Sequence, residues 1–327
     1  MTARISYRHN QDLLQQRADT VLREGARLSV EDEDQLLVSC DASRFRGIVP
    51  LSCQLGTFHM LHLGDDYVAE RLLWFGAFGY ERCSAVTFTH LAERASLVLD
   101  LGTYTGYYSL LSAVLAKNTA TYGVEANPLN FHRTSENLRI NGVDVTIANR
   151  AVIPAGEDRE TVDLRYNAGL AVLDAGGFAV HEQAESMSYK QRKEDTFTVR
   201  AQSLPSLLTE WNVDLAAMAE AMVLVKVDVE GLEAPLVKDA LELFVNNEVC
   251  LFVEILNPEV YEAIWSLVQT RDDLGLAYID EYNQEITLQS SDRLHRTKGS
   301  RNFIVGSTTI LESVVGSVPS SLLATYE

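Results

Sequence analysis

The chain has 327 residues, of which 46% are hydrophobic, and a formal net charge of −19 at pH 7. This negative field repels phosphate backbones and anionic lipid, so the composition argues against a nucleic-acid substrate and against a membrane surface as partner. Because no run of about 18 or more apolar residues occurs, we predict no membrane-spanning helix.

The cysteines and histidines give no sign of a metal site. The seven histidines form no HxxxH or HxH pair. The four cysteines show no CxxC spacing, which predicts reduced thiols at Cys40, Cys53, Cys83 and Cys250. The N-terminus lacks the apolar segment of a signal peptide, so we expect a cytoplasmic protein.

Residues 1–65 are expected to form an N-terminal extension or lid, ahead of a main domain over residues 66–327. The extension begins with an amphipathic helix near residues 10–24, and the short apolar runs GIVPLSCQL and TFHMLHL then predict a pair of strands. Two amphipathic helices follow, because apolar residues recur at i, i+3 and i+4 in DDYVAERLLWFGAF and ERCSAVTFTHLAER.

From Ser96 onward, short β-rich runs alternate with helical segments. The runs LVLDL, ATYGVE, VTIAN, MVLVKVD and VCLFVEIL predict strands, and the end of the chain predicts two or three antiparallel strands in LAYIDEYNQEITL and RNFIVG. This alternation is typical of an α/β fold with a mostly parallel sheet. Residues 154–200 lack such a pattern, so we expect an irregular insertion there that shapes the acceptor side of the site.

Ligands of such sheets bind beyond the carboxyl ends of the strands, near the switch in strand order. The polar residues at the predicted strand ends are therefore the first candidates for a site. They are Asp100, Glu125, Asn149, Asp228 and Glu254.

The first of these acids begins a D-x-G-x-x-x-G turn that includes Gly102 and Gly106. A dinucleotide fold requires G-x-G-x-x-G, and Asp100 would place a negative charge where the pyrophosphate lies. An acid suits S-adenosylmethionine, which has a sulfonium and an ammonium but no phosphate. Glu125 lies 25 residues later and could accept both hydroxyls of a ribose, as acids do in NAD sites.

Each residue of this turn also has a purely structural interpretation. Gly102 and Gly106 would serve a plain tight turn and close helix packing. Asp100 would cap the following helix, a role compatible with binding.

The stretch VLVKVDVEGLE is the second informative segment. On a strand, Lys226, Asp228 and Glu230 share one face, which is costly in a central strand unless the charges are paired or open to a cleft. For Lys226 we expect a buried ion pair, with Glu254 on the neighbouring strand as partner. For Asp228 and Glu230 we favour a place in the site, because charged strand ends at such a cleft are where sites form.

Taken together, VLDLGTYTGYYSLL, YGVEANPLNF, NLRINGV, NRAV and LVKVDVEGLEAPLVKDA resemble the FkbM-type methyltransferases. The resemblance covers roughly residues 65–305. It implies a class I, Rossmann-like fold with a seven-stranded sheet whose last strand is antiparallel, and methyl transfer from S-adenosylmethionine to hydroxyls of natural products or sugars. The turn departs from the family pattern, because it reads GTYTG where the family often has GANIG. Because Tyr104 is bulky, the shape of the acceptor side of the site does not follow from the resemblance.

Carried over by motif, the resemblance assigns Asp100, Gly102 and Gly106 to the cofactor turn and Glu125 to the ribose. It places Asn149 at the adenine edge. Glu81, in the segment FGAFGYE, is a weaker candidate for the amino-acid end of the cofactor.

Methyl transfer to an alcohol benefits from a base. Asp228 and Glu230 are the first candidates, and His181 in FAVHEQ is another. Carboxylates at Asp228 and Glu254 would suit magnesium, although we predict no metal. The Asn-Pro-Pro-aromatic motif of amino-group and nucleobase methyltransferases is absent after the fourth strand, where VDVEG stands instead.

The predicted partner is thus a small hydroxylated acceptor, and the helices before Ser96 offer a face for a homodimer. Two alternatives remain open. One is an NAD-dependent oxidoreductase, which the missing first glycine disfavours. The other is a non-catalytic S-adenosylmethionine-binding module, which would have no need to keep Asp228 and Glu230.

Overall fold

The computed structural model describes residues 45–117, 120–167, 179–180, 194–229, 231–290, 294 and 300–317. The helix expected near residues 10–24 lies outside these ranges. No helix in the described part of the chain has the length and apolar character needed to cross a membrane.

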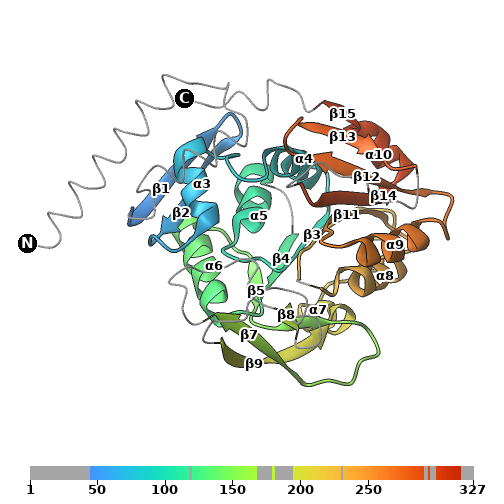
Figure 1. The fold of residues 1–327 in the computed structure, drawn as a ribbon, viewed down its shortest axis with the longest axis horizontal. Helices are drawn as coiled ribbons and strands as arrows, with labels where there is room; N and C mark the ends of the chain where they lie inside the picture. Colours follow the sequence, from blue (N-terminus) through green and yellow to red (C-terminus); the bar gives the residue numbers. More distant parts are fainter. Residues whose placement is uncertain are drawn as a thin grey trace, which may run out of the picture.

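A nine-stranded sheet forms the centre of the molecule (Figure 1). From one edge to the other its strands are β5 (Thr146–Ala148), β4 (Ala120–Val124), β3 (Leu97–Leu101), β10 (Met222–Val227), β11 (Glu248–Glu254), β14 (Asn302–Ser307), β12 (Leu274–Asp280), β13 (Glu285–Leu288) and β15 (Gly316–Ser317). The first five of these are parallel to one another, and β14 runs antiparallel between β11 and β12. The strand order reverses between β3 and β10, where α/β sheets bind their ligands.

The strands from β5 to β12 have the arrangement of the class I methyltransferase fold, with the expected antiparallel strand. The expected count of seven strands is too low for the whole sheet, because β13 and β15 extend its edge. β13 forms a hairpin with β12, and its Ile286 is buried, which explains why this short strand stays on the sheet.

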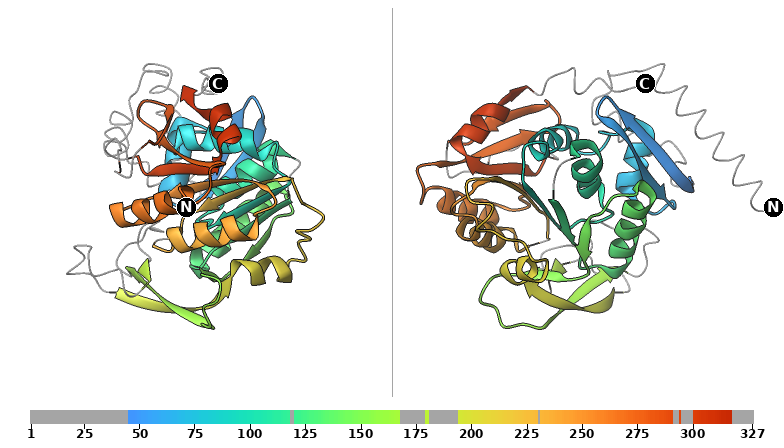
Figure 2. Two further views of the ribbon diagram at one scale, coloured as in Figure 1. Left: turned by 90° about the vertical axis from the view of Figure 1, so that its right-hand side faces the viewer. Right: turned by 180° about the vertical axis from the view of Figure 1, so that it is seen from behind.

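Helices cover both faces of the sheet (Figure 2). Alternate residues of β3 separate the two sides, since Val98 belongs to one hydrophobic cluster while Leu97 and Leu99 belong to the other. The first side carries α3 (Tyr67–Phe75), α4 (Arg82–Ala92), α5 (Tyr107–Leu110), the π-helical segment η3 (Leu111–Ala116), α6 (Pro128–Asn141) and α10 (Thr308–Val314). The second carries α7 (Leu204–Glu210), α8 (Glu233–Leu243) and α9 (Pro258–Val268).

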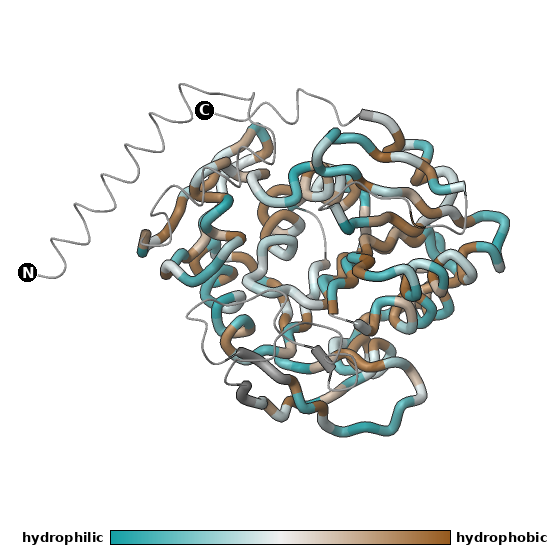
Figure 3. Tube along the Cα trace, in the orientation of Figure 1, coloured by the Kyte–Doolittle hydropathy of each residue, from teal (hydrophilic) through white to brown (hydrophobic). Residues whose placement is uncertain are grey.

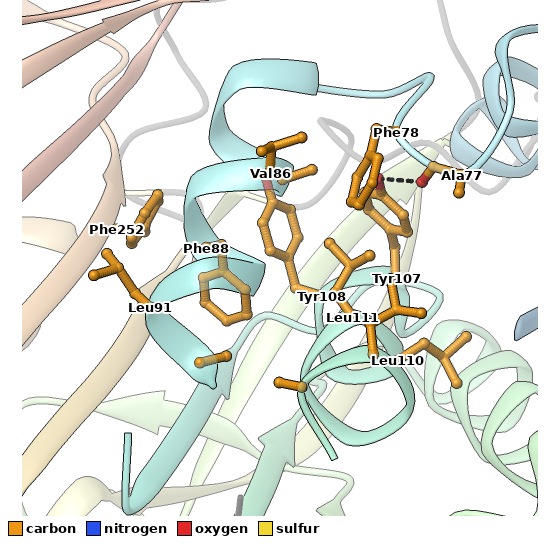
Figure 4. Close-up of a cluster of buried hydrophobic side chains, with 14 of the residues drawn as sticks. Ala77, Phe78, Val86, Phe88, Leu91, Tyr107, Tyr108, Leu110, Leu111 and Phe252 are labelled. Atoms are coloured by element: carbon orange, nitrogen blue, oxygen red, sulfur yellow. Dashed lines mark hydrogen bonds between the residues drawn. The ribbon is translucent and has the colours of Figure 1, made fainter. Parts of the chain in front are cut away.

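Hydrophobic residues follow the central strands, while hydrophilic ones gather on the outer segments (Figure 3). An aromatic cluster supports the helix that follows the glycine turn (Figure 4). The ring of Phe88 meets those of Tyr108 and Phe252 edge-on, at centroid distances of 5.0 and 5.4 Å. Tyr107 donates a hydrogen bond to the carbonyl oxygen of Ala77 at 2.8 Å. The start of α5 is therefore held from two directions.

The strand pair expected after residue 46 is present as the hairpin β1 (Gly47–Cys53) and β2 (Gly56–His62). Phe58 and Met60 are fully buried in the cluster that also includes α3, α4 and α5. Asn137 of α6 joins this hairpin to the glycine turn: it accepts a hydrogen bond from the Leu61 amide and donates one to the Thr105 carbonyl, both at 2.7 Å.

We expect Asn137→Ala to lower the free energy of unfolding by about 3 kcal/mol. The substitution leaves the partly buried Leu61 amide and the buried Thr105 carbonyl without their partner, and each such group costs roughly 1–3 kcal/mol. Urea unfolding should show a lower midpoint at an unchanged slope. Arg139→Ala is the control, because within the described ranges this exposed side chain of the same helix pairs with the exposed Glu136 alone. Equal midpoints for the two variants would contradict the role given to Asn137.

Residues 154–200 are less irregular than expected. β6 (Ala151–Ile153), β7 (Thr161–Asn167), β8 (Ala179–Val180) and β9 (Glu194–Ser203) form a second sheet in the order β6-β9-β7-β8. In β7, Val162 and Leu164 are buried while Thr161 and Asp163 are exposed. Such alternation is typical of a strand that packs one face on a core, and the polar-apolar order of the sequence TVDL already predicts it. The expectation of irregular structure is therefore wrong for β7.

Candidate functional site

The backbone amides of the turn after β3 donate hydrogen bonds to other groups of the protein. The amides of Gly102 and Thr103 both donate to the carbonyl oxygen of Val124, at 2.9 and 3.0 Å. The amide of Tyr104 donates to Glu125 Oε2 at 2.7 Å, and that of Gly106 donates to the Thr103 carbonyl at 2.8 Å. These four donors are therefore engaged within the protein.

Both glycines of the turn are required by geometry. Gly102 has φ +87°, and a Cβ there would lie 1.8 Å from the carbonyl oxygen of Asp228. Gly106 also has φ +87°, and its Cβ would lie 2.9 Å from Thr134 Cγ2. The interpretation of Gly102 and Gly106 as a tight turn with close packing thus holds, and the same turn forms one wall of a cavity. Tyr104, with φ 52°, adopts the left-handed region that Asn tolerates better.

That cavity has a volume of about 470 Å³ and lies over the carboxyl ends of β3, β4, β10 and β11. Its polar lining comes from four acidic and four basic side chains, from three other polar residues and from five tyrosines: Glu125, Glu157, Asp228, Glu254, Arg150, Arg159, Lys226, Arg301, Thr103, Asn127, Asn130, Tyr67, Tyr80, Tyr104, Tyr107 and Tyr108. Its apolar lining includes Val124, Ala126, Val152, Ile153, Leu232 and Leu256. We call it the first cavity.

Glu125, at the end of β4, contributes a buried carboxylate to the first cavity. Oε2 accepts the Tyr104 amide and Oε1 accepts the Asn127 amide at 2.8 Å. Glu125 is only 7% exposed. This burial raises the pKa of its carboxyl group from 4.5 to about 8, although the two hydrogen bonds favour the ionised form. A hydroxyl or cationic ligand nearby would favour the ionised form.

Lys226 and Asp228 form an ion pair at the end of β10, with Nζ to Oδ2 at 2.5 Å. The Lys226 ammonium also lies 4.7 Å from the centre of the Tyr108 ring. The expected pair between Lys226 and Glu254 is wrong, and the register explains why. Lys226 lies opposite Phe252, so Glu254 is two residues further along the neighbouring strand and pairs instead with Arg301 at 3.7 Å.

Asp100 lies beneath the turn and is absent from the lining of the first cavity. Its Oδ2 accepts a hydrogen bond from Ser109 Oγ at 2.7 Å, and its Oδ1 has no hydrogen-bond partner in the part of the chain that the structure describes. Burial raises the pKa of Asp100, while the nearby Lys226 opposes this. Gly106, and not Asp100, occupies the N-cap position of α5. The Asp100 carboxyl still interacts with both the hydroxyl and the backbone amide of Ser109, so it supports the first turn of this helix from outside the N-cap position.

Asn149 and Glu81 also lie outside the lining of the first cavity. Both amide hydrogens of Asn149 are engaged, donating to the carbonyls of Glu125 and Ala126 at 2.8 and 3.0 Å. Asn149 therefore braces the loop that carries Glu125. Glu81 begins α4 with φ 43° and accepts a hydrogen bond from Tyr108 at 2.7 Å. It lines a second cavity instead.

Glu230 and His181 lie outside the described residues, so both stay predictions. In the described ranges no group of three or more His, Cys, Asp or Glu side chains is arranged to hold a metal ion.

The structure adds lining residues that the sequence did not single out. Asn130 is 3% exposed, and its Oδ1 has no hydrogen-bond partner among the described residues. Asn130 lies in the first turn of α6, soon after the strand end at Glu125. This position in the sequence could have predicted it as a lining residue. Tyr80 and Arg301 carry no comparable local signal, because they come from distant loops.

No protein-family model matches this chain, and no curated protein matches it in sequence. Among solved structures it is similar to the O-methyltransferase TomG from Streptomyces achromogenes in complex with SAM, with 13% identity over 69% of this chain and 78% of that one and a TM-score of 0.36. It is also similar to an O-methyltransferase from Bacillus cereus in complex with SAH (10% identity, 69% and 80%, TM-score 0.37).

A third solved structure is a SAM-dependent methyltransferase from Agrobacterium tumefaciens, with 11% identity, 80% of this chain and 70% of that one covered, and a TM-score of 0.39. Likeness at this level carries no argument about activity. The assignment of the fold therefore rests on the strand order of the sheet.

Proposed function

We propose that this chain is an S-adenosylmethionine-dependent methyltransferase that binds its cofactor in the first cavity. The observation that carries the proposal is the pairing of an internally hydrogen-bonded glycine turn with carboxylates at the ends of β4 and β10. A dinucleotide site needs free amides for its pyrophosphate. Here the amides of Gly102, Thr103, Tyr104 and Gly106 are already engaged.

The residues present fit this cofactor. Glu125, Asp228 and Glu254 place carboxyl groups at the ends of β4, β10 and β11, where they suit a sulfonium and an ammonium. Because Arg150, Arg159, Lys226 and Arg301 also line the cavity, this preference comes from the local position of the carboxyl groups and not from net charge. Glu125 lines the cavity, which supports its proposed role of accepting the ribose hydroxyls, and the apolar lining supports a place for adenine. Such a mixed pocket of a few hundred Å³ is typical of cofactor sites. The same features disfavour the NAD-dependent alternative.

When bound, the cofactor supplies an electrophilic methyl group. The chain's own part is to hold an acceptor hydroxyl in line, exclude water and take the hydroxyl proton. We propose that Asp228 or Glu254 takes the hydroxyl proton. Glu230 and His181, which lie outside the described residues, are further candidates. The acceptor is a hydroxylated small molecule, either a natural product or a sugar.

The raised pKa of Glu125 predicts that S-adenosylmethionine binding releases a proton near neutral pH. The carboxyl is largely protonated below a pKa of about 8, and a cationic, hydroxyl-bearing ligand favours its ionised form. Because a proton leaves on binding, affinity should rise with pH up to about 8 and level off above it. Calorimetric titration in phosphate and in Tris buffer, which differ in ionisation enthalpy, measures the release. Equal heats in the two buffers would contradict the assignment.

Methyl transfer itself is tested with methyl-tritiated S-adenosylmethionine and a panel of hydroxylated compounds. We expect labelled product with the wild type and at least a 100-fold lower rate for Asp228→Asn or Glu254→Gln, whichever residue takes the proton. Glu136→Gln is the control, since Glu136 pairs on the surface with Arg139. Cofactor binding without transfer to any compound would favour the non-catalytic module.

A further inference from the structure

A second cavity of about 350 Å³ adjoins the first one along the carboxyl edge of the sheet. The two share Tyr67, Tyr80, Glu254 and Arg301 in their linings, so they meet at these side chains. The second cavity lies over the ends of β11 and β12 and the start of β14, which runs antiparallel and so begins at this edge. A compound in it would reach the first cavity beside Glu254.

The lining of the second cavity lacks the aliphatic side chains that line the first. Apart from Gly79, every described side chain that lines it is polar, charged or a tyrosine, and no aliphatic side chain takes part. Three glutamates face three arginines, so the formal charges of the lining cancel. A wall that offers donors and acceptors in equal measure and little net charge suits an uncharged ligand with many hydroxyls, because each hydroxyl both donates and accepts.

Several of these groups are held in place before any ligand arrives. The Glu281 carboxylate accepts the amides of Cys83 and Ser84 at 2.7 and 3.0 Å. Arg71 donates from Nε to the Gly79 carbonyl at 3.0 Å. The rings of Tyr67 and Tyr80 meet edge-on at 6.2 Å. A fixed wall reduces the entropy lost on binding.

Asn302 places a side-chain amide on the wall of the second cavity. The residue is only 7% exposed and lines the cavity, and no residue in the described part of the chain hydrogen-bonds its side chain. Its amide atoms are not fully buried, so they are open to the cavity and available to a ligand or to water. Asn302 lies opposite Glu254 in the register of β11 and β14, at the meeting point of the two cavities.

We infer that the second cavity binds the methyl acceptor and that this acceptor is an uncharged polyhydroxylated compound of carbohydrate type. The inference rests on the proposed function and narrows its acceptor class. It also moves the acceptor from the side of residues 154–200 to the opposite end of the sheet edge. Tyrosine rings at the meeting point would pack on the C–H face of a sugar, while Asn302 and the charged groups would take its hydroxyls.

The test is saturation-transfer NMR on the full chain loaded with S-adenosylhomocysteine. The probes are the methyl glycosides of glucose, galactose, mannose and rhamnose, with catechol as the planar, apolar comparison. We expect at least one glycoside to bind and catechol not to bind. Asn302→Leu should weaken glycoside binding at least tenfold while changing the affinity for S-adenosylhomocysteine less than twofold, because Asn302 is outside the first cavity.

Gln269→Leu is the matched control. Gln269 is an exposed amide at the C-terminal end of α9, which begins beside the carboxyl edge and runs back toward the opposite one. Absence of glycoside binding, glycoside binding that Asn302→Leu leaves intact, or preferential binding of catechol would overturn the inference while the proposed function stands. Failure of the wild type to bind S-adenosylhomocysteine would overturn the proposed function itself.

Discussion

We expect Glu125→Gln to weaken S-adenosylmethionine binding about 100-fold, which corresponds to about 2.7 kcal/mol. The substitution keeps the shape of the side chain and one oxygen, so one of the two backbone amides that Glu125 accepts retains its partner. It removes the charge that faces the cofactor and weakens the bonds to the ribose hydroxyls. Hydrogen bonds to charged groups contribute roughly 1.5–3 kcal/mol each, which sets the size of the effect.

Calorimetric titration measures this difference, with Glu136→Gln as the matched control. Glu136 is an exposed glutamate of α6, next along the chain from the loop that carries Glu125. The control should bind as the wild type does. The proton release predicted near neutral pH should also disappear in Glu125→Gln, because its source is gone. A variant that binds the cofactor within twofold of the wild type would remove Glu125 from the site.

Gly102→Ala is expected to lower the free energy of unfolding by roughly 5 kcal/mol, or to prevent folding. Its Cβ would lie 1.8 Å from the carbonyl oxygen of Asp228, and the backbone has φ +87°. Because that oxygen belongs to the backbone at the end of β10, the clash can be relieved only by separating the turn from the strand. Losses of this size arise from strain and overpacking at buried positions.

The variant Gly142→Ala shows how much of the effect comes from the positive φ alone, without a steric clash of the new Cβ. Gly142 also has a positive φ, +63°, but a Cβ there meets nothing within 4 Å. Gly142→Ala should lower the free energy of unfolding by about 1 kcal/mol, the cost of a left-handed backbone conformation for alanine. Urea unfolding of both variants measures the difference. Similar midpoints would show that the turn does not press against β10.

The sequence predicts those parts of the site that depend on neighbours along the chain. Gly102, Gly106 and Glu125 each belong to a single strand-turn-helix unit, and their patterns persist whatever packs around them. The strand order also follows from the alternation of strands and helices, once the resemblance to a known fold is added. The edge strand β13 was predicted only as one of two or three antiparallel strands at the end of the chain, and β15 was not predicted, because short strands carry little periodic signal.

Errors arose where the result depends on the register between strands or on contacts between distant segments. The partner of Lys226 is set by its alignment with Phe252, which no single strand reveals. Asp100 has the charge expected of a cofactor contact, but the turn covers it and Ser109 takes one of its oxygens. The second cavity brings together Tyr80 and Glu281 from two separate loops and Asn302 from the start of β14, so no local sequence motif indicates it.

The most direct test of the central claim is calorimetric titration of the full chain with S-adenosylmethionine and, separately, with NADH. The account predicts micromolar binding of S-adenosylmethionine and no measurable binding of NADH, because the amides of the glycine turn are engaged and carboxyl groups stand at the ends of β4, β10 and β11. Binding of NADH, or no binding of S-adenosylmethionine, would contradict the assignment of the first cavity.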